Sequence, residues 1–317
     1  MPESEPFISI FTAPKPFTNP HIRLIQRNAI KSWLSLGEEV RVFLIGDEPG
    51  MAEFAKETGV HHLTWVASNP LGTPLVSSIF GIARQMSTSP LLAYVNADIL
   101  LTPQFIEISR QVCNQKKKFL IVGQRHDLDV QEELEFSPGW DQALKTSVRI
   151  RGRLHPPAGS DYFIFPRACF INIPNFTVGR AGWDNWMIYY ARTQQYPVID
   201  ATPSLIVVHQ DHDYSHLPNG QPHYRLPETY ENIRLAGGPR TIFTLVDANY
   251  FIQDGRIWPT RRHGREWLRE IEIFPLTRLH SLFLADIFFS ILHPVKAWKE
   301  WRARVAYKLR QKRKSNA

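Results

Sequence analysis

The chain has 317 residues, 43% of them hydrophobic and 21% charged, which is the composition of a globular protein with a large core. Its two cysteines, Cys113 and Cys169, exclude a disulfide framework and a cysteine-based zinc cluster. The net charge of +7 is concentrated at the C-terminus: residues 295–317 hold nine basic residues and one acidic residue, a net +8, so residues 1–294 sum to −1. We therefore expect no nucleic-acid partner. The first residues lack the apolar segment of a signal peptide, so we expect a cytoplasmic protein.

Residues 1–123 alternate between short apolar runs and segments with apolar residues at helical spacing. The apolar runs predict strands over residues 7–12, 40–45, 62–66, 91–101 and 119–123. The spaced segments predict helices over residues 21–36, 51–58, 73–86 and 103–114. Strands that alternate with helices are typical of a three-layer α/β/α fold with a mostly parallel central sheet, and this is the fold class that we expect.

The pattern changes after residue 123. The elements predicted there are a helix over 140–148, a strand over 159–167, a loop over 176–183, a helix over 184–194 and a strand over 198–208. Residues 217–265 are rich in proline, glycine and arginine, and we expect irregular structure packed on the body. The expected organisation is one domain over 1–216, then this irregular segment, then a helical and basic extension over 266–317.

The stretch around Asp98 carries the clearest functional signal. Five apolar or aromatic residues lead into Asn96, which suits a strand buried on both faces. Burying a carboxylate costs free energy unless it is paired or binds a metal, and ligands of open α/β sheets sit at the carboxyl ends of strands. Asp98 is therefore a candidate site residue, with Asn96 on the same side two positions earlier. The alternative is a turn or helix cap, a common role of Asp at a strand end.

Three features follow one another along the chain: an N-x-D motif that ends at Asp98, the pair Trp183-Asp184 at a loop-to-helix junction, and a histidine-rich stretch over 209–216. In this order they resemble the GT-A glycosyltransferases, the nucleotide-diphospho-sugar transferase fold, over about residues 6–216. That family has a D-x-D motif after its fourth strand, and this chain has Asn in place of the first Asp. Each motif alone is short and weakly specific.

The resemblance implies that Asp98 holds Mn²⁺ or Mg²⁺ on the diphosphate of a nucleotide sugar. His209, which directly follows a predicted strand, is the first candidate for a further metal ligand, and His212 is the second. A hard cation suits carboxylate and phosphate oxygens, and a histidine ligand favours Mn²⁺. In the alternative interpretation these histidines are loop residues.

Inverting members of the family use a carboxylate at the start of a helix after the acceptor loop, and Asp184 matches that position as a general base. The alternative for Asp184 is a helix cap that accepts hydrogen bonds from free backbone N–H groups. Trp183 and Trp186 match acceptor-binding aromatic residues that stack on a sugar face, and buried packing is the alternative.

The resemblance further implies a donor half over about 1–123 and an acceptor half over about 124–216. Asp161 would bind sugar hydroxyls and Arg125 a phosphate or a carboxylate; the alternatives are a strand-end turn for Asp161 and a surface ion pair for Arg125. The whole set of expected donor-binding residues is Thr12, Ala13, Pro14, Asp47, Ser77, Ser78, Arg84, Asn96, Arg125 and Asp161.

The C-terminal segment combines apolar and basic residues. Residues 279–292 are mostly apolar but too short and too polar to span a bilayer. After them, Trp298, Trp301, Val305 and Tyr307 are interleaved with lysine and arginine, which is typical of an interfacial helix. Residues 279–317 therefore predict contact with an anionic membrane surface, at the inner face of the membrane for a cytoplasmic protein. The alternative is a C-terminal helix docked on the body.

Together these patterns predict a metal-dependent glycosyltransferase that moves a sugar from a nucleotide sugar, a UDP-sugar in first place, to a polysaccharide, glycan or lipid-linked acceptor. An inverting reaction with Asp184 as base is preferred, and a retaining transferase is the first alternative. A sugar-phosphate nucleotidyltransferase would need a glycine-rich loop after the first strand, which this chain lacks. The alternative of another class is a membrane-peripheral scaffold with a degenerate transferase fold, which the substitution at Asn96 would allow.

Overall fold

The computed structural model describes residues 5–212 and 226–315, with only the backbone described for residue 304 and residues 307–315. The chain forms two compact units, Met1–Thr260 and Arg261–Ala317, which are described separately below. The end of the predicted histidine-rich stretch, residues 213–216, and the predicted domain boundary at 216 lie outside the described residues.

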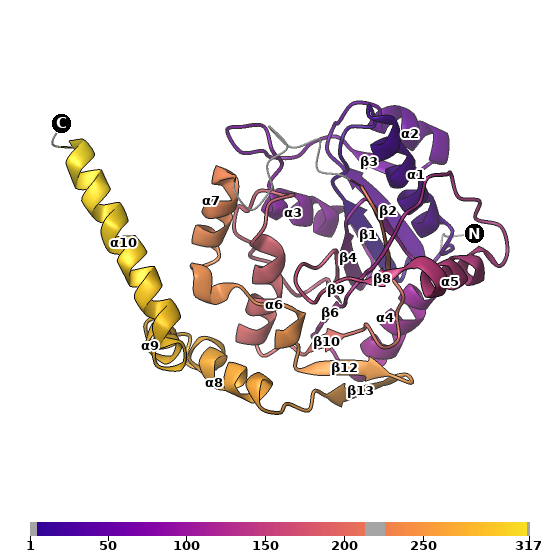
Figure 1. Ribbon diagram of the computed structural model, residues 1–317. Helices are drawn as coiled ribbons and strands as arrows, with labels where there is room; N and C mark the ends of the chain where they lie inside the picture. The colour runs from indigo at the N-terminus through magenta and orange to yellow at the C-terminus, as the bar shows by residue number, and fades with distance from the viewer. Residues whose placement is uncertain (1–4, 213–225, 316–317) are drawn as a thin grey trace. The chain divides into compact units, whose positions relative to one another are not determined.

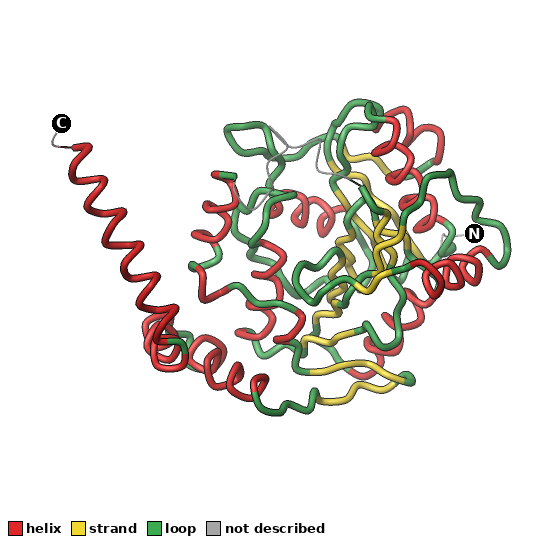
Figure 2. Tube along the Cα trace, in the orientation of Figure 1, coloured by secondary structure: helices red, strands yellow, loops and turns green. Residues whose placement is uncertain are grey.

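The first unit is built on a nine-stranded sheet (Figures 1 and 2). Its strands are β1 (Ile8–Thr12), β2 (Val40–Ile45), β3 (His61–Leu63), β4 (Leu91–Val95), β6 (Leu120–Val122), β9 (Tyr162–Pro166), β10 (Val198–Asp200), β12 (Tyr250–Gln253) and β13 (Arg256–Pro259). Their order across the sheet is β13-β12-β10-β6-β9-β4-β1-β2-β3. Neighbouring strands are parallel except that β9 runs antiparallel to β4 and β6, and β13 runs antiparallel to β12.

Helices cover both faces of this sheet. Helices α1 (Pro20–Leu34), α2 (Met51–Thr58) and α4 (Gln104–Gln115) lie on one side, and α3 (Val76–Met86) and α6 (Trp183–Thr193) lie on the other (Figure 1). Strand residues alternate between the faces: Ala93 joins the aliphatic core under α1, α2 and α4, whereas Tyr94 contacts Phe80 of α3 and Trp183 of α6. The predicted three-layer α/β/α fold with a mostly parallel sheet is confirmed.

A second, four-stranded sheet follows the carboxyl end of the first. Its strands are β5 (Ile99–Leu100), β7 (His126–Leu128), β8 (Arg153–Leu154) and β11 (Val208–Gln210), in the order β5-β11-β7-β8. Helix α5 (Trp140–Arg151) packs on it through Leu144 and Val148, which form a small core with residues of β5, β7 and β11. Of this layer α5 was predicted, whereas β7 and β8 were not and the residues of β5 fell inside the strand predicted over 91–101, because strands of two or three residues carry no readable alternation.

The chain crosses between the two sheets at several tightly packed points. Gly123, which follows β6 directly, is one of them: a Cβ at this position would lie 2.4 Å from the Tyr162 hydroxyl and 3.1 Å from the Thr202 backbone nitrogen. Such distances leave no room for a side chain, so close approach of the backbone requires glycine here. The crossing after β10 is a turn in which the Asp200 carboxylate accepts hydrogen bonds from the Thr202 N–H (2.8 Å) and hydroxyl (2.5 Å).

These crossings correct two predicted strands. The stretch over 91–101 is two strands, because the chain turns between β4 and β5, where the Ile99 N–H donates to the Asn96 carbonyl at 3.1 Å. The strand expected over 198–208 is also two strands, β10 and β11, in different sheets. In both cases the turn residues, 96–98 and 202–204, are only partly buried or exposed, but apolar residues on both sides of the turn made the stretch resemble one strand.

The expectation of irregular structure over 217–265 is wrong for most of its described part. Helix α7 (Pro227–Leu235) lies there, with two short 3₁₀ segments, Pro239–Thr241 and Leu245–Asp247. Strands β12 and β13 extend the large sheet beyond β10. The proline and glycine residues that suggested irregularity begin these elements or join them, as with Pro227 at the first position of α7.

The second unit is helical. It consists of α8 (Arg265–Thr277), α9 (Leu282–Leu292) and α10 (Pro294–Ser315). Among the described helices, none combines the length and the apolar character needed to cross a membrane.

One hydrogen bond ties α1 to the strand that follows the functional motif, and it yields a stability prediction. The indole nitrogen of the fully buried Trp33 donates to the Ile99 carbonyl at 2.8 Å. Replacing Trp33 by Phe removes this donor from a buried acceptor, so the free energy of unfolding should fall by about 1–3 kcal/mol in urea titrations. The matched variant Trp65→Phe, at a side chain that is 70% exposed, should change it by less than about 0.5 kcal/mol. Equal midpoints for Trp33→Phe and the parent chain would contradict the prediction.

Candidate metal centre and donor site

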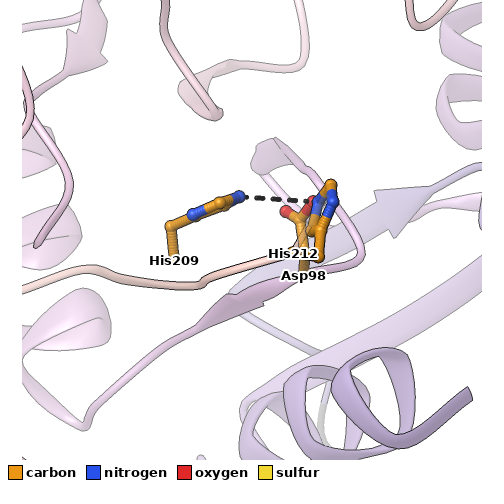
Figure 3. Close-up of side chains that lie close together, drawn as sticks. All are labelled: Asp98, His209 and His212. Atoms are coloured by element: carbon orange, nitrogen blue, oxygen red, sulfur yellow. Dashed lines mark hydrogen bonds and ion pairs between the residues drawn. The ribbon is translucent and has the colours of Figure 1, made fainter. Parts of the chain in front are cut away.

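Asp98 lies in the turn between β4 and β5, at the carboxyl end of the large sheet, and two histidines face it (Figure 3). The Asp98 Oδ2 atom is 3.1 Å from His212 Nε2 and 3.8 Å from His209 Nε2. Its Oδ1 atom is buried and has no hydrogen-bond partner in the described part of the chain. A buried carboxylate oxygen without a partner is costly unless a ligand completes it.

Strand pairing in the second sheet brings these residues together. β11 runs antiparallel to β5, so that His209 lies opposite Ile99, and the Gln210 N–H donates to the Asp98 carbonyl at 3.2 Å. The fully buried side chain of Gln210 fixes the pairing, because its amide donates to the carbonyls of Ile25 (2.8 Å) and Asp98 (3.2 Å). The fold therefore sets the place of His209 relative to Asp98 through the backbone.

Asp127 lies beside the His209 ring, whose Nδ1 atom is buried and has no hydrogen-bond partner among the described residues. In the parallel pairing of β7 with β11 these two residues lie opposite each other, and His209 Nδ1 is 3.3 Å from Asp127 Oδ1. A carboxylate beside Nδ1 favours a proton on that nitrogen, which leaves the lone pair on Nε2, toward Asp98. Burial also lowers the pKa of His209, so its ring is neutral near pH 7, the form that binds metals.

The Asp98 carboxylate is held in its ionised form. Burial by itself raises the pKa of Asp98, but the hydrogen bond with His212 and the positive charge of Lys15 oppose it, and the pKa lies well below its usual range. Lys15 belongs to the loop after β1, where its backbone exchanges hydrogen bonds of 2.7 and 2.9 Å with the Gln26 side chain. Sequence reasoning missed Lys15 as a site residue, because a single lysine in a turn carries no pattern.

Asp98, His209 and His212 form a group that we call the metal cluster. One ligand atom from each of them lies within 4.8 Å of the others. The donor set and the unpartnered Asp98 oxygen suit a divalent cation such as Mn²⁺, which accepts both carboxylate and imidazole ligands. A second candidate group, Asp127, His209 and Asp211, shares His209 with the first.

Arg125 connects the metal cluster to Asp161. Its guanidinium donates to Asp161 Oδ2 at 2.6 Å through Nη1 and to Asp127 Oδ1 at 3.0 Å through Nε. Asp161 meets the end of β4 because β9 is antiparallel, so the residue before β9 lies where β4 ends. There the Asn96 backbone N–H donates to the Asp161 carbonyl at 2.8 Å, and the Asn96 side-chain amide donates to Asp161 Oδ1 at 2.9 Å. Asn96, Arg125 and Asp161 thus lie together, and their assignment to donor binding stays a prediction.

Asp184 lies at the start of α6 and accepts a hydrogen bond from the Gly182 N–H at 3.1 Å. Burial raises its pKa, and the nearby charge of Asp161 raises it further. The charges of Asp98, Asp161 and Asp184 also each add to the rise in the pKa of Tyr94, whose main cause is burial. Asp184 therefore interacts electrostatically with Asp161, and it accepts hydrogen bonds at the N-terminus of α6 at the same time.

The two tryptophans beside Asp184 correct the expectation that they stack on a sugar. Trp183 and Trp186 are 5% and 6% exposed. The Trp183 ring packs edge-on against Tyr94, with centroids 4.9 Å apart, and Trp186 stacks on Tyr190 at 4.7 Å. Both rings belong to the aromatic packing beside α6 and offer no face to an acceptor.

Arg84 is also removed from the candidate site. Its guanidinium donates to the carbonyls of Cys169 and Phe170 at 2.8 and 2.9 Å, just beyond the end of β9. Because β9 is antiparallel to β4, this end of β9 lies at the start of β4, at the edge of the sheet opposite to Asp98. Arg84 therefore fixes a loop far from the metal cluster.

The other predicted donor-binding residues have mixed surroundings. Ser77 and Ser78 bind neighbouring loops, through the Asn175 side chain at 2.8 Å and the Ala67 N–H at 2.9 Å. The Thr12 hydroxyl is buried and lacks a hydrogen-bond partner among the described residues. Residues 13 and 14 follow it in the loop that leads to Lys15, and Asp47 is exposed after β2.

No protein-family model matches the chain, and no curated protein sequence matches it. Solved structures with related folds are found. TarS of S. aureus in complex with UDP-GlcNAc is 10% identical, with a TM-score of 0.47 over 72% of this chain and 65% of the TarS chain. Glucosyl-3-phosphoglycerate synthase from Mycobacterium tuberculosis, in complex with Mn²⁺, UDP and phosphoglyceric acid, is 13% identical, with a TM-score of 0.45 over 74% and 80%. The mannosyltransferase PcManGT from Pyrobaculum calidifontis, in complex with GDP-Man and Mn²⁺, is 10% identical, with a TM-score of 0.42 over 67% and 59%. The chain spans less than two thirds of the length of TarS.

The raised pKa of Asp184 predicts a pH-dependent gain in stability on its neutralisation. An acid whose pKa is higher in the folded state than its usual 3.8 destabilises the fold when it is ionised, and this cost disappears below the unfolded-state pKa. Asp184→Asn keeps an oxygen for the Gly182 N–H and carries no charge. Its melting temperature should therefore exceed that of the parent chain at pH 7, and the difference should shrink as the pH falls to about 4.

The control for this prediction is Asp129→Asn, at an exposed position, which should show no such trend. A melting temperature of Asp184→Asn that is below the parent value at pH 7 would show that the helix needs the charge at this position more than burial opposes it.

Proposed function

We propose that this chain is a metal-dependent glycosyltransferase that moves a sugar from a nucleotide sugar to a hydroxyl group of a glycan or lipid-linked acceptor. The observation that carries the proposal is the half-buried Asp98 carboxylate, with one buried oxygen unpartnered in the described chain and two histidines facing the other. It lies at the carboxyl end of β4, where the resemblance to GT-A transferases places the metal-binding acid.

In this proposal Asp98, His209 and His212 hold Mn²⁺ or Mg²⁺, and the two imidazoles favour Mn²⁺. The bound ion would neutralise the negative charge that develops on the diphosphate leaving group. Asp127 Oδ1 lies 3.3 Å from Nδ1 of the His209 ring, and a carboxylate there favours the tautomer whose Nε2 can bind a metal. Lys15, in the loop after β1, interacts electrostatically with Asp98 and favours its ionised form.

The donor sugar is assigned to the Asn96, Arg125 and Asp161 group. Each Asp161 carboxylate oxygen accepts one hydrogen bond from within the chain and can accept another from a sugar hydroxyl. The base and ribose are assigned to the loop after β1, which carries the unpartnered Thr12 hydroxyl, and to Asp47 after β2. A UDP-sugar is the preferred donor.

Asn96 argues against a degenerate scaffold. Its side-chain amide donates to Asp161, a contact that an aspartate at this position would replace by repulsion between two carboxylates. The departure from D-x-D thus has a structural reason in this chain. With Asn at position 96, the neighbouring carboxylate is that of Asp161, which is hydrogen-bonded to Asn96. Asp98 remains the acid that faces the histidines.

Asp184 is the proposed general base of an inverting reaction. The acceptor oxygen forms a bond to the anomeric carbon, the bond from that carbon to the diphosphate breaks, and the acceptor proton moves to Asp184. Burial raises the pKa of Asp184, which makes its carboxylate a better proton acceptor than an exposed aspartate. A retaining transferase, the alternative, would need no base at this position.

The donor and the metal are tested together by thermal shift. The chain is melted with UDP, GDP, CDP, ADP or dTDP, each with and without Mn²⁺ or Mg²⁺. One nucleotide, UDP in first place, should stabilise the chain only when the metal is present, by about 2.7 kcal/mol at a hundredfold excess over its Kd. Asp98→Asn should lose this metal-dependent shift, whereas Asp129→Asn should keep it. Shifts that are absent for every nucleotide, or unchanged in Asp98→Asn, would refute the assignment.

The base is tested by turnover. With the donor identified by the thermal-shift panel, Asp184→Asn should release the nucleoside diphosphate at least about 10²-fold more slowly, because the acceptor proton has no carboxylate to receive it. Its nucleotide-induced thermal shift should equal that of the parent chain, since Asp184 is not assigned to the donor. Near-normal turnover would leave Asp184 with its helix-capping role alone.

A further inference from the structure

The second unit presents large apolar side chains to solvent along α9 and α10. Within its described residues we define the C-terminal apolar surface as Leu279, Leu282, Phe283, Ile287, Ile291, Val295, Trp298, Trp301 and Val305, all of which are exposed. Exposed apolar groups that stand singly are common, whereas a concentration of them on consecutive helices is typical of an interaction site.

Helical spacing places these residues on definite faces. Phe283, Ile287 and Ile291 are four residues apart and lie on one side of α9. Ala285 and Phe289, on a different side of the same helix, are buried at 2% and 9% exposure. One face of α9 is therefore already buried by packing. The face that carries Phe283 is a different one, and it is exposed.

Exposed apolar residues at helical spacing also occur on α10. Trp298, Trp301 and Val305 follow one another at intervals of three and four residues, and so form one stripe. The Trp298 and Trp301 side chains are 55% and 61% exposed. Tryptophan is the residue that membrane proteins place at the boundary between lipid and water.

Basic residues border the α10 stripe. Lys296, Lys299 and Arg302 are exposed, and the Arg302 guanidinium lies 4.7 Å from the centre of the Trp298 ring. Residues 295–317 carry a net charge of +8, against −1 for residues 1–294. Long basic side chains next to an apolar stripe can place their stems on lipid and their charges among the headgroups.

We propose that the C-terminal apolar surface docks on an anionic lipid bilayer, with α9 and α10 lying in the interface. Charge complementarity selects this occupant. Two copies of the chain that met through this surface would bring two basic segments together, which repel each other. A nucleic acid would satisfy the charges and leave the tryptophans without an apolar partner.

The strength of such docking follows from two contributions. Apolar contact alone gives weak and reversible binding, and basic residues add attraction to anionic lipids; together they give stable attachment. No described helix is apolar and long enough to cross the bilayer, which agrees with binding along the surface.

The test uses the full chain and two kinds of vesicle: phosphatidylcholine alone, and equal parts of phosphatidylcholine and phosphatidylglycerol. The chain should sediment with the anionic vesicles, and much less with the neutral ones, and high salt should weaken the binding. Binding to neither vesicle, or equal binding to both, would overturn the proposal.

Two pairs of variants separate the two contributions. Lys296→Gln/Lys299→Gln should lower the partition onto anionic vesicles about 25-fold, because each basic residue near the surface contributes about fivefold. The control Lys56→Gln/Lys117→Gln removes two exposed charges from the first unit and should change it less than twofold.

For the apolar contribution, Trp298→Ser/Trp301→Ser should lower the partition at least about tenfold on both vesicles. Its control, Trp65→Ser/Leu71→Ser, removes two side chains that are exposed in the first unit and should bind as the parent chain does. Partition that is unchanged in both C-terminal variants, or lowered equally in their controls, would assign the binding to another surface.

Sedimentation velocity without vesicles tests whether the C-terminal apolar surface binds a second copy of the chain instead of lipid. The proposal expects the same molecular mass for the parent chain and for Trp298→Ser/Trp301→Ser. A parent dimer that becomes a monomer in this variant, together with failure to bind vesicles, would show that this surface joins two chains and would overturn the lipid assignment.

Discussion

The antiparallel pairing of β5 with β11 holds the candidate site together, because it places His209 beside the turn that carries Asp98. The same strand β11 pairs with β7 on its other side, which puts Asp127 opposite His209. Both pairings involve only two or three residues, and the buried Gln210 strengthens them by binding the Asp98 carbonyl. A small sheet beyond the end of a large one thus determines which side chains meet, while the large sheet fixes the turn from which Asp98 projects.

Charge is distributed unequally among the four buried or half-buried carboxylates of this region. Asp98, Asp127 and Asp161 each have a basic or histidine partner, and the partners lower the pKa of Asp98 and of Asp127 even though burial raises both. Asp184 has only backbone N–H partners described, and burial raises its pKa. Carboxylates whose pKa values are pushed in opposite directions within one site are suited to different tasks, one to remain ionised and one to take up a proton.

Much of this arrangement could be predicted from the sequence, and the failures have physical reasons. The cost of burying a carboxylate after an apolar strand identified Asp98, and helical and strand periodicity identified the layered fold. The second sheet was missed because its strands are too short to alternate, and Lys15 because one lysine in a turn carries no pattern. Trp183 was assigned to a sugar because an aromatic residue before a helix has the same sequence signature whether it packs inward or outward. Arg84 was misplaced because a helix position does not reveal which end of the sheet a long side chain reaches.

The two-sheet construction also has a consequence for local stability. The small sheet and α5 share a core of few buried residues, so this layer has less intrinsic cohesion than the nine-stranded sheet. A ligand that touches Asp98 and His209 at once bridges the end of β4 and the strand β11. The binding free energy of such a ligand therefore also stabilises the packing of the small sheet on the large one. As a result, ligand binding and the local folding of β7, β8 and β11 are thermodynamically coupled.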